Sequence, residues 1–151
     1  MKYVKLFEEH INEIGDAGAK SYKWRWMNPK YDTYSIFTTD SGLEYQVMTQ
    51  LGSGETLSVE YGVNVTTKKG NKSVDYELVT NRGELFRVMA TVVDIIQEFM
   101  KKHQDIEYIE FEGSKNEDGD QRRNKLYMQY IKKHLKPKSI EDDGTLITIE
   151  L

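Results

Sequence analysis

The sequence contains no cysteine, so disulfide bonds and thiolate metal sites are excluded. It has no apolar run close to the length of a membrane span, and its first residues lack the basic and apolar regions of a secretory signal peptide. The three histidines, His10, His103 and His134, do not have the spacing of metal ligands. We therefore expect a cytoplasmic protein with no membrane contact and no metal site.

The sequence also lacks internal repeats, low-complexity tracts and any linker that would divide it. A chain of 151 residues, with 38% hydrophobic and 30% charged residues, is long enough and apolar enough to fold as one domain. The net charge of −4 at pH 7 argues against general nucleic-acid binding but leaves room for a local basic patch. We expect a single α+β domain over residues 1–151.

An N-terminal helical extension is expected over residues 1–18. The stretch from Val4 to Ile14 has apolar side chains at helical spacing, and two glycines, Gly15 and Gly18, follow it. A helix this short is marginal alone, so it must dock on something. The domain's own sheet and a partner protein are both possible docking surfaces, and the sheet is the simpler interpretation.

Residues 22–80 show the alternation of apolar and polar side chains that predicts an antiparallel meander with one apolar face. Turn residues such as Gly52-Ser53-Gly54 separate the expected strands. These strands cover residues 22–27, 33–39, 43–51, 57–65 and 74–78. Trp24 and Trp26 share one face of the first strand, where they either pack in the core or form a stacking platform for a ring. Core packing is the more common outcome for aromatics at this spacing.

Residues 81–151 are expected to form helix, strand, helix and strand. A wide apolar stripe of helical period predicts the first helix, and Asn81 with Glu84 has the form of a capping box at its start. Residues 106–112 read as a short strand, 121–135 as the second helix and 145–151 as the closing strand. The predicted fold is α+β: a curved, mixed, mostly antiparallel sheet covered by two main helices and a short N-terminal helix.

Two features that suggest ligand sites have simpler explanations. The loop from Ser114 to Lys125 resembles a calcium loop but has a lysine where the bidentate carboxylate is needed. His103 and His134 lie near predicted helix C-termini, where an imidazolium is favourable, and neither has an evident partner. We therefore assign both histidines a structural role.

The segment from Gln121 to Lys138 has no acidic residue and seven basic ones. Cations belong at the end of a helix, but Arg122 and Arg123 lie at its start, where the dipole disfavours them unless anions are near. These anions are either carboxylates of this chain, such as Asp118 and Asp120, or the phosphate of a ligand. Both alternatives remain open from the sequence.

The run Asp120-Gln-Arg-Arg-Asn-Lys-Leu-Tyr127, with the order of elements from Asn81 onward, resembles the second half of GNAT-type N-acyltransferases. That family has a glycine-rich pyrophosphate loop before the first helix, where this chain keeps Gly83. The resemblance implies acetyl-CoA as cofactor and Tyr127 as the general acid that protonates the departing CoA thiolate. It implies phosphate contacts from the residues around the two helix starts: Asn81, Arg82, Gly83, Arg122, Arg123 and Lys125.

The same half is similar to a group of small, uncharacterised tailed-phage proteins. The shared patterns are Val88-Met-Ala-Thr-Val92, Ile109-Glu-Phe-Glu-Gly-Ser114 and Arg123-Asn-Lys-Leu-Tyr127. This resemblance implies an accessory protein, located in the host cytoplasm or on the virion, with a virion component or a host protein as partner.

We therefore expect a phage-type accessory protein that acts as a binding module on an acyltransferase-like scaffold. The alternative is an active N-acyltransferase that uses acyl-CoA. A weaker alternative is a nucleotide or RNA binder that uses the basic face from Arg122 to Lys138.

Overall fold

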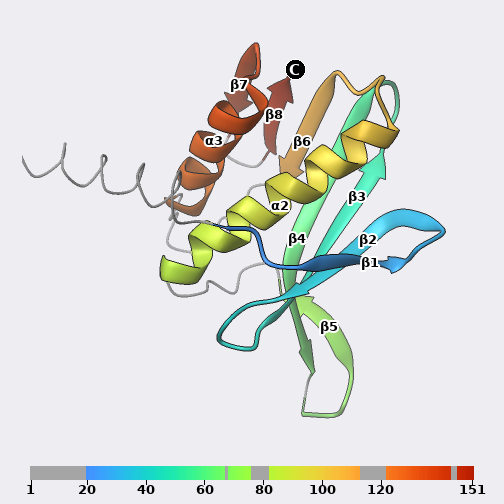
Figure 1. Ribbon diagram of the computed structural model, residues 1–151, viewed down its shortest axis with the longest axis vertical. Coiled ribbons are helices and arrows are strands. Elements are labelled where there is room, and N and C mark those ends of the chain that lie inside the picture. The colour runs from blue at the N-terminus through green and yellow to red at the C-terminus, as the bar shows by residue number, and fades with distance from the viewer. Residues whose placement is uncertain (1–19, 67, 76–81, 113–121, 144–145) are drawn as a thin grey trace, which may run out of the picture.

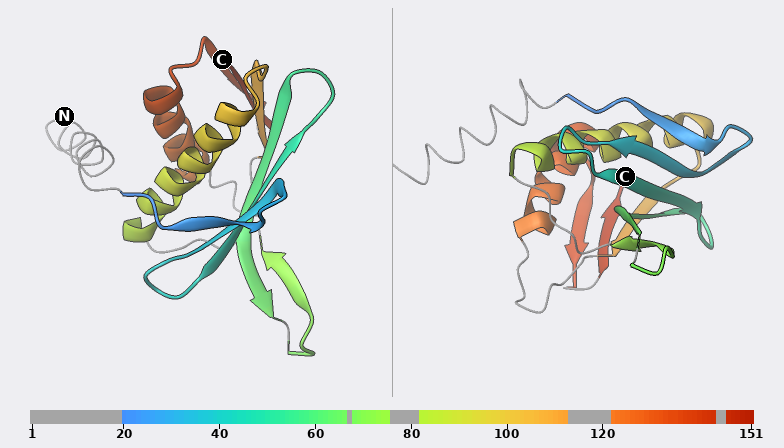
Figure 2. Two further views of the ribbon diagram at one scale, coloured as in Figure 1. Left: turned by 45° about the vertical axis from the view of Figure 1, so that its right-hand side comes forward. Right: turned by 90° about the horizontal axis from the view of Figure 1, so that it is seen from below.

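The computed structural model describes residues 20–66, 68–75, 82–112, 122–143 and 146–151. This part of the chain forms an open, mixed, mostly antiparallel sheet of eight strands with two helices on one of its faces (Figures 1 and 2). The predicted α+β class and the mixed sheet are confirmed. The expected N-terminal helix, residues 1–18, lies outside the described residues.

The first five strands form the predicted antiparallel meander. They are β1 (Trp24–Asn28), β2 (Tyr31–Thr38), β3 (Glu44–Leu51), β4 (Thr56–Thr66) and β5 (Lys72–Asp75). Gly54, in the turn between β3 and β4, has a φ of +73°, a conformation that glycine adopts without steric cost. The turn predicted at this position is therefore confirmed.

A helix carries the chain from the meander to a parallel strand. Helix α2 (Arg82–Lys102) leads to β6 (Tyr108–Glu112), which pairs with the first half of β4 from Thr56↔Tyr108 to Val59↔Phe111. Parallel neighbours need such a crossover because a tight turn joins only antiparallel strands. β4 and β6 are the one parallel pair within the described sheet.

The chain ends with α3 (Arg122–Leu135), β7 (Ser139–Asp142) and β8 (Leu146–Glu150), and the sheet has the order β1-β2-β3-β4-β6-β8-β7. The prediction of α3 is confirmed, and the predicted closing strand corresponds to β8. β7 was not predicted. It has four residues and one apolar side chain, Ile140, which pairs with Ile149, so it carries too little alternation to be recognised.

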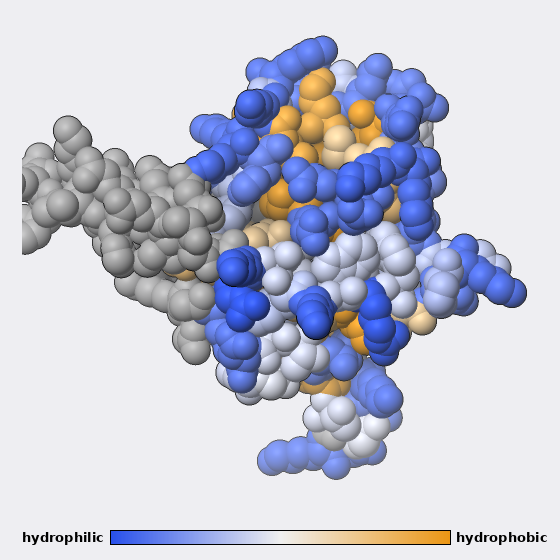
Figure 3. Space-filling view, viewed as in Figure 1, coloured by the Kyte–Doolittle hydropathy of each residue, from blue (hydrophilic) through white to orange (hydrophobic). Residues whose placement is uncertain are grey.

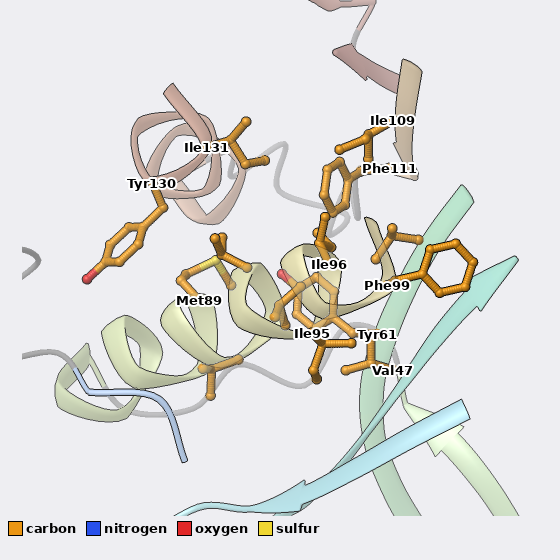
Figure 4. Close-up of a cluster of buried hydrophobic side chains, with 14 of the residues drawn as sticks. Val47, Tyr61, Met89, Ile95, Ile96, Phe99, Ile109, Phe111, Tyr130 and Ile131 are labelled. Atoms are coloured by element: carbon orange, nitrogen blue, oxygen red, sulfur yellow. The ribbon is translucent and has the colours of Figure 1, made fainter. Parts of the chain in front are cut away.

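The core lies between the two helices and the sheet, and Figure 4 shows its centre. The predicted stripe of α2 faces the core: Met89, Val92 and Ile96 have no exposed surface, Phe99 and Val93 are buried, and Leu85, Phe86 and Met100 are partly buried. They pack with inward-facing residues of the central strands, such as Val47, Val59 and Ile109. In Figure 3, apolar side chains reach the surface in a strip between the two helices. Neither described helix is long and apolar enough to cross a membrane.

Part of the polar side of α2 is also covered, because the residues before β1 and the start of β1 run along it. The backbone N–H of Tyr22 donates to Oγ1 of Thr91 (2.8 Å), and the indole N–H of Trp24 donates to Asp94 (2.9 Å). Thr91 is fully buried as a result. The rings of Trp24 and Trp26 meet edge to face at 5.0 Å and pack against the core, which confirms the core interpretation of this pair.

Candidate functional site

The two helices begin on the same side of the molecule (Figures 1 and 2), and the carboxyl end of β6 overlaps the middle of α2 in the view of Figure 1. At this level β4 changes its partner: its pairing with β6 ends at Val59↔Phe111, and its pairing with β5 begins at Val63↔Asp75. Ligands of sheets with helical crossovers bind outside the carboxyl ends of parallel strands. This side of the molecule is therefore the first place to examine for a site.

The residues that the sequence singled out fall on these two helix starts. Arg82 and Gly83 are the first residues of α2, and the others lie in the first two turns of α3: Arg122, Arg123, Lys125 and Tyr127. The backbone thus brings the two groups to one side of the molecule. Their side chains, the whole of Asn81 and the loop at 113–121 lie outside the described residues.

Glu84 places a carboxylate in the first turn of α2, and this carboxylate is buried. Its side chain accepts two hydrogen bonds from Ser41, one from the backbone N–H (2.6 Å) and one from the hydroxyl (2.8 Å). Glu84 is 7% exposed. Because the start of a helix is partly positive, a carboxylate there is favourable. The start of α2 is therefore occupied by an anion of the chain itself.

Arg87, one turn further along α2, is also fully engaged. Its Nη1 lies 2.9 Å from Asp40 Oδ2, and its Nε donates to the carbonyl of Lys20 at 2.9 Å. The guanidinium carbon lies 3.8 Å from the ring centre of Tyr22. Burial is the main cause that raises the pKa of the Tyr22 phenol. Arg87 therefore fastens the segment before β1 to α2, and the carboxylate of Asp40 neutralises its charge.

Tyr130 lies one turn after Tyr127 and faces α2. It is 5% exposed, and its ring centre lies 6.4 Å from that of Phe86 and 5.8 Å from that of His134. Burial raises the pKa of Tyr130 to about 12. Its phenol is therefore a neutral group of the interface between the helices (Figure 4).

No partner of His103 is evident in the sequence, but the structure has one. Its Nε2 lies 2.7 Å from Oδ2 of Asp32, and its ring stacks on Phe99 at 4.3 Å. Asp32 is on β2, 71 residues earlier, and nothing local in the sequence marks the two residues as partners. His103 is thus a contact between the end of α2 and the sheet.

A second feature that the sequence analysis missed is the surface of the β1–β2 hairpin. Three large apolar side chains are exposed there: Met27 (49%), Tyr31 (65%) and Tyr34 (42%). The basic residues Lys23, Arg25 and Lys30 of the same segment are also exposed. We call these six residues the hairpin surface. The sequence did carry a signal for the hairpin surface, because the alternation around β1 puts Lys23 and Arg25 on the face opposite the two tryptophans.

Within the described ranges, no three His, Cys, Asp or Glu residues are grouped as metal ligands.

A comparison with curated proteins gives no match. The model of a protein family of unknown function, DUF6934, matches residues 30–146. The matched range begins just before β2 and includes the parallel pair β4–β6 with both helices. The chain therefore belongs to DUF6934, a family of unknown function.

Proposed function

We propose that this chain is a protein-interaction module on an acyltransferase-like scaffold, and that it does not use acyl-CoA. The observation that carries the proposal is the group of exposed apolar side chains on one hairpin, Met27, Tyr31 and Tyr34. Large apolar side chains gathered on the surface, with polar residues around them, are typical of a site that a partner covers. Tyrosine and methionine are also enriched in protein interfaces.

The scaffold part of the proposal is supported by the order of elements after the meander. After β5, α2 leads to β6, which lies parallel to β4, and α3 and a closing pair of strands follow. This is the order expected from the resemblance to GNAT-type enzymes. The setting as a phage accessory protein, with a virion or host protein as partner, rests on the shared residue patterns at 88–92 and 123–127.

Glu84 argues against acyl-CoA as a ligand. In the enzymes that the chain resembles, the first helix starts at the pyrophosphate, whose negative charge the helix dipole favours. In this chain the same position holds a buried carboxylate, fixed by two hydrogen bonds from Ser41. A second anion at this helix start would meet the first one in a poorly solvated environment, where like charges repel strongly.

An N-acyltransferase is the second candidate, and one observation favours it. The starts of α2 and α3 lie on the same side of the molecule, so the backbone places Arg82, Arg122, Arg123 and Lys125 on that side. In this alternative these cations contact the phosphates of acyl-CoA, and Tyr127 acts as the general acid.

Calorimetry and thermal shift with acetyl-CoA, CoA and common nucleotides separate the two candidates. We expect no saturable binding of any of them. Saturable binding of acetyl-CoA that is lost in the Arg122→Glu/Arg123→Glu variant would establish the acyl-CoA site and refute the interaction module as proposed. Binding of nucleotides alone, lost in the same variant, would instead favour a nucleotide or RNA binder.

The interaction itself is tested by cross-linking the purified chain in a lysate of its native cells. We expect one predominant cross-linked partner that is lost in the Tyr31→Ser/Tyr34→Ser variant. Tyr108→Ser is the matched control, because Tyr108 is also an exposed tyrosine (38%) but lies on β6. If the hairpin variant and the control retain the same partner, the hairpin surface is not the binding site.

A further inference from the structure

β1 is the first strand in the order of the sheet, and its outer edge pairs with no strand of the described chain. It is nevertheless held firmly. Trp24 is bonded to Asp94 on α2, and the ammonium group of Lys102 lies 5.6 Å from the ring centre of Trp26. Tyr22, just before the strand, is fixed by Thr91 and Arg87. An edge strand that is fixed in this way presents a preformed row of backbone donors and acceptors.

The cations in and next to β1 have no carboxylate partner within the described part of the chain. Among the described residues, Lys23, Arg25 and Lys30 take part in no ion pair. Three carboxylates of β2, of the turn after it and of α2 are engaged with other groups: Asp32 with His103, Asp40 with Arg87 and Asp94 with Trp24. The edge of β1 therefore carries a positive charge that the described chain leaves uncompensated.

Building on the proposed function, we propose that β1 accepts an extended acidic segment of a partner protein as an additional strand. Main-chain hydrogen bonds to the free edge of β1 supply affinity, and alternate side chains supply specificity. The carboxylates of such a segment meet Lys23 and Arg25 on one face of the sheet, and its apolar side chains lie on the other face, beside Trp24 and Trp26. The charges also steer the partner toward the edge and suppress basic competitors.

Single-stranded nucleic acid fits the same surface less well. It makes no use of the backbone groups at a strand edge, and its bases need aromatic platforms across several strands. The row of side chains that contains Tyr34 continues through Met48 to Glu60 on β4, so a phosphate backbone crossing the sheet would meet a carboxylate. The observations therefore favour an acidic peptide.

The test uses the full chain and a short fluorescent peptide of alternating valine and glutamate, with the valine–lysine peptide as its control. We expect the glutamate peptide to bind and to slow hydrogen exchange of those β1 amides that do not bond to β2. The Lys23→Glu/Arg25→Glu variant should bind it at least roughly tenfold more weakly. The matched control is Lys68→Glu/Lys69→Glu, which changes the charge equally at the exposed turn between β4 and β5.

Each of the following results would overturn the inference. The first is equal binding of the lysine peptide, or binding without protection of β1 amides. The second is binding of an oligothymidylate but not of the glutamate peptide, which would indicate nucleic acid. The third is self-association in sedimentation that Lys23→Glu/Arg25→Glu abolishes, which would identify a second copy of the chain as the occupant. If Tyr31→Ser/Tyr34→Ser loses the cross-linked partner while Lys23→Glu/Arg25→Glu retains it, the interaction module stands and the added strand is refuted.

Discussion

Nε2 of His103 lies 2.7 Å from Oδ2 of Asp32, and this contact joins the last turn of α2 to β2. Both side chains are about one-third exposed, so water screens the contact only in part. It lies in the part of the sheet that carries the hairpin surface, where β2 follows the β1–β2 turn. The pair therefore contributes to the fixed position of the hairpin.

We predict a coupling energy of about 1 kcal/mol between these two residues in a double-mutant cycle of Asp32→Asn and His103→Gln. Urea unfolding of the four proteins gives this energy directly. The control is the Glu98–Lys101 pair on the exposed side of the same helix, with side chains that are 42% and 72% exposed. Exposed pairs contribute little, so its coupling should be clearly smaller. Equal coupling in the two pairs would show that burial of the His103 contact adds nothing.

Two buried hydroxyls on neighbouring strands give a second prediction. Ser35 Oγ is fully buried and has no hydrogen-bond partner among the described residues, whereas the hydroxyl of Thr49 donates to the carbonyl of Asp32 at 2.6 Å. An unpaired buried hydroxyl costs free energy, and a paired one does not.

Ser35→Ala should therefore leave the free energy of unfolding unchanged or raise it by up to about 1 kcal/mol. Thr49→Val should lower it by about 1 kcal/mol, because the Asp32 carbonyl loses its donor. Urea unfolding monitored by tryptophan fluorescence measures both variants. Destabilisation by Ser35→Ala as large as that by Thr49→Val would mean that the Ser35 hydroxyl has a partner.

Regular elements with strong periodicity were predictable, and contacts between distant segments were not. The stripe of α2 and the alternation in β4 repeat over many residues, so hydrophobic burial alone identifies them. β7 has one apolar side chain, and its existence depends on pairing with β8. The same limit applies to the site. Glu84 was expected at a helix start, but its bonds come from Ser41, 43 residues earlier, where no local pattern indicates them.

A pair of carboxyl groups at the starts of β4 and β6 should make stability depend on pH. The hydrogen bond to Glu107, and then the charge of Glu107, raise the pKa of Glu55 above its ordinary value. The folded chain therefore holds this proton more tightly than the unfolded chain does, and the associated stability is lost as pH rises through the folded pKa.

Glu55→Gln should accordingly raise the melting temperature at pH 7, where the two carboxylates repel each other. The gain should shrink as pH falls through the raised pKa of Glu55 and be lost below about 4.5. Melting curves across this range measure the effect. Glu141→Gln on β7 is the control, because it removes one exposed carboxylate far from this pair in the order of the sheet. A gain at pH 7 that is equal in both variants would indicate an effect of net charge rather than of the Glu55–Glu107 pair.

Tyr130 should limit stability at alkaline pH. Burial raises its pKa from the ordinary value of 10.0 to about 12 in the folded chain. Between these values the unfolded chain has released the phenol proton while the folded chain still holds it. The unfolded state then binds fewer protons, so the free energy of unfolding falls as pH rises, by on the order of 2 kcal/mol across the window.

Tyr130→Phe keeps the ring beside Phe86 and removes this proton. Its unfolding free energy in urea should therefore fall less steeply than that of the natural chain between about pH 10 and pH 12. Equal slopes would show that the Tyr130 phenol ionises in the folded chain as readily as in the unfolded one.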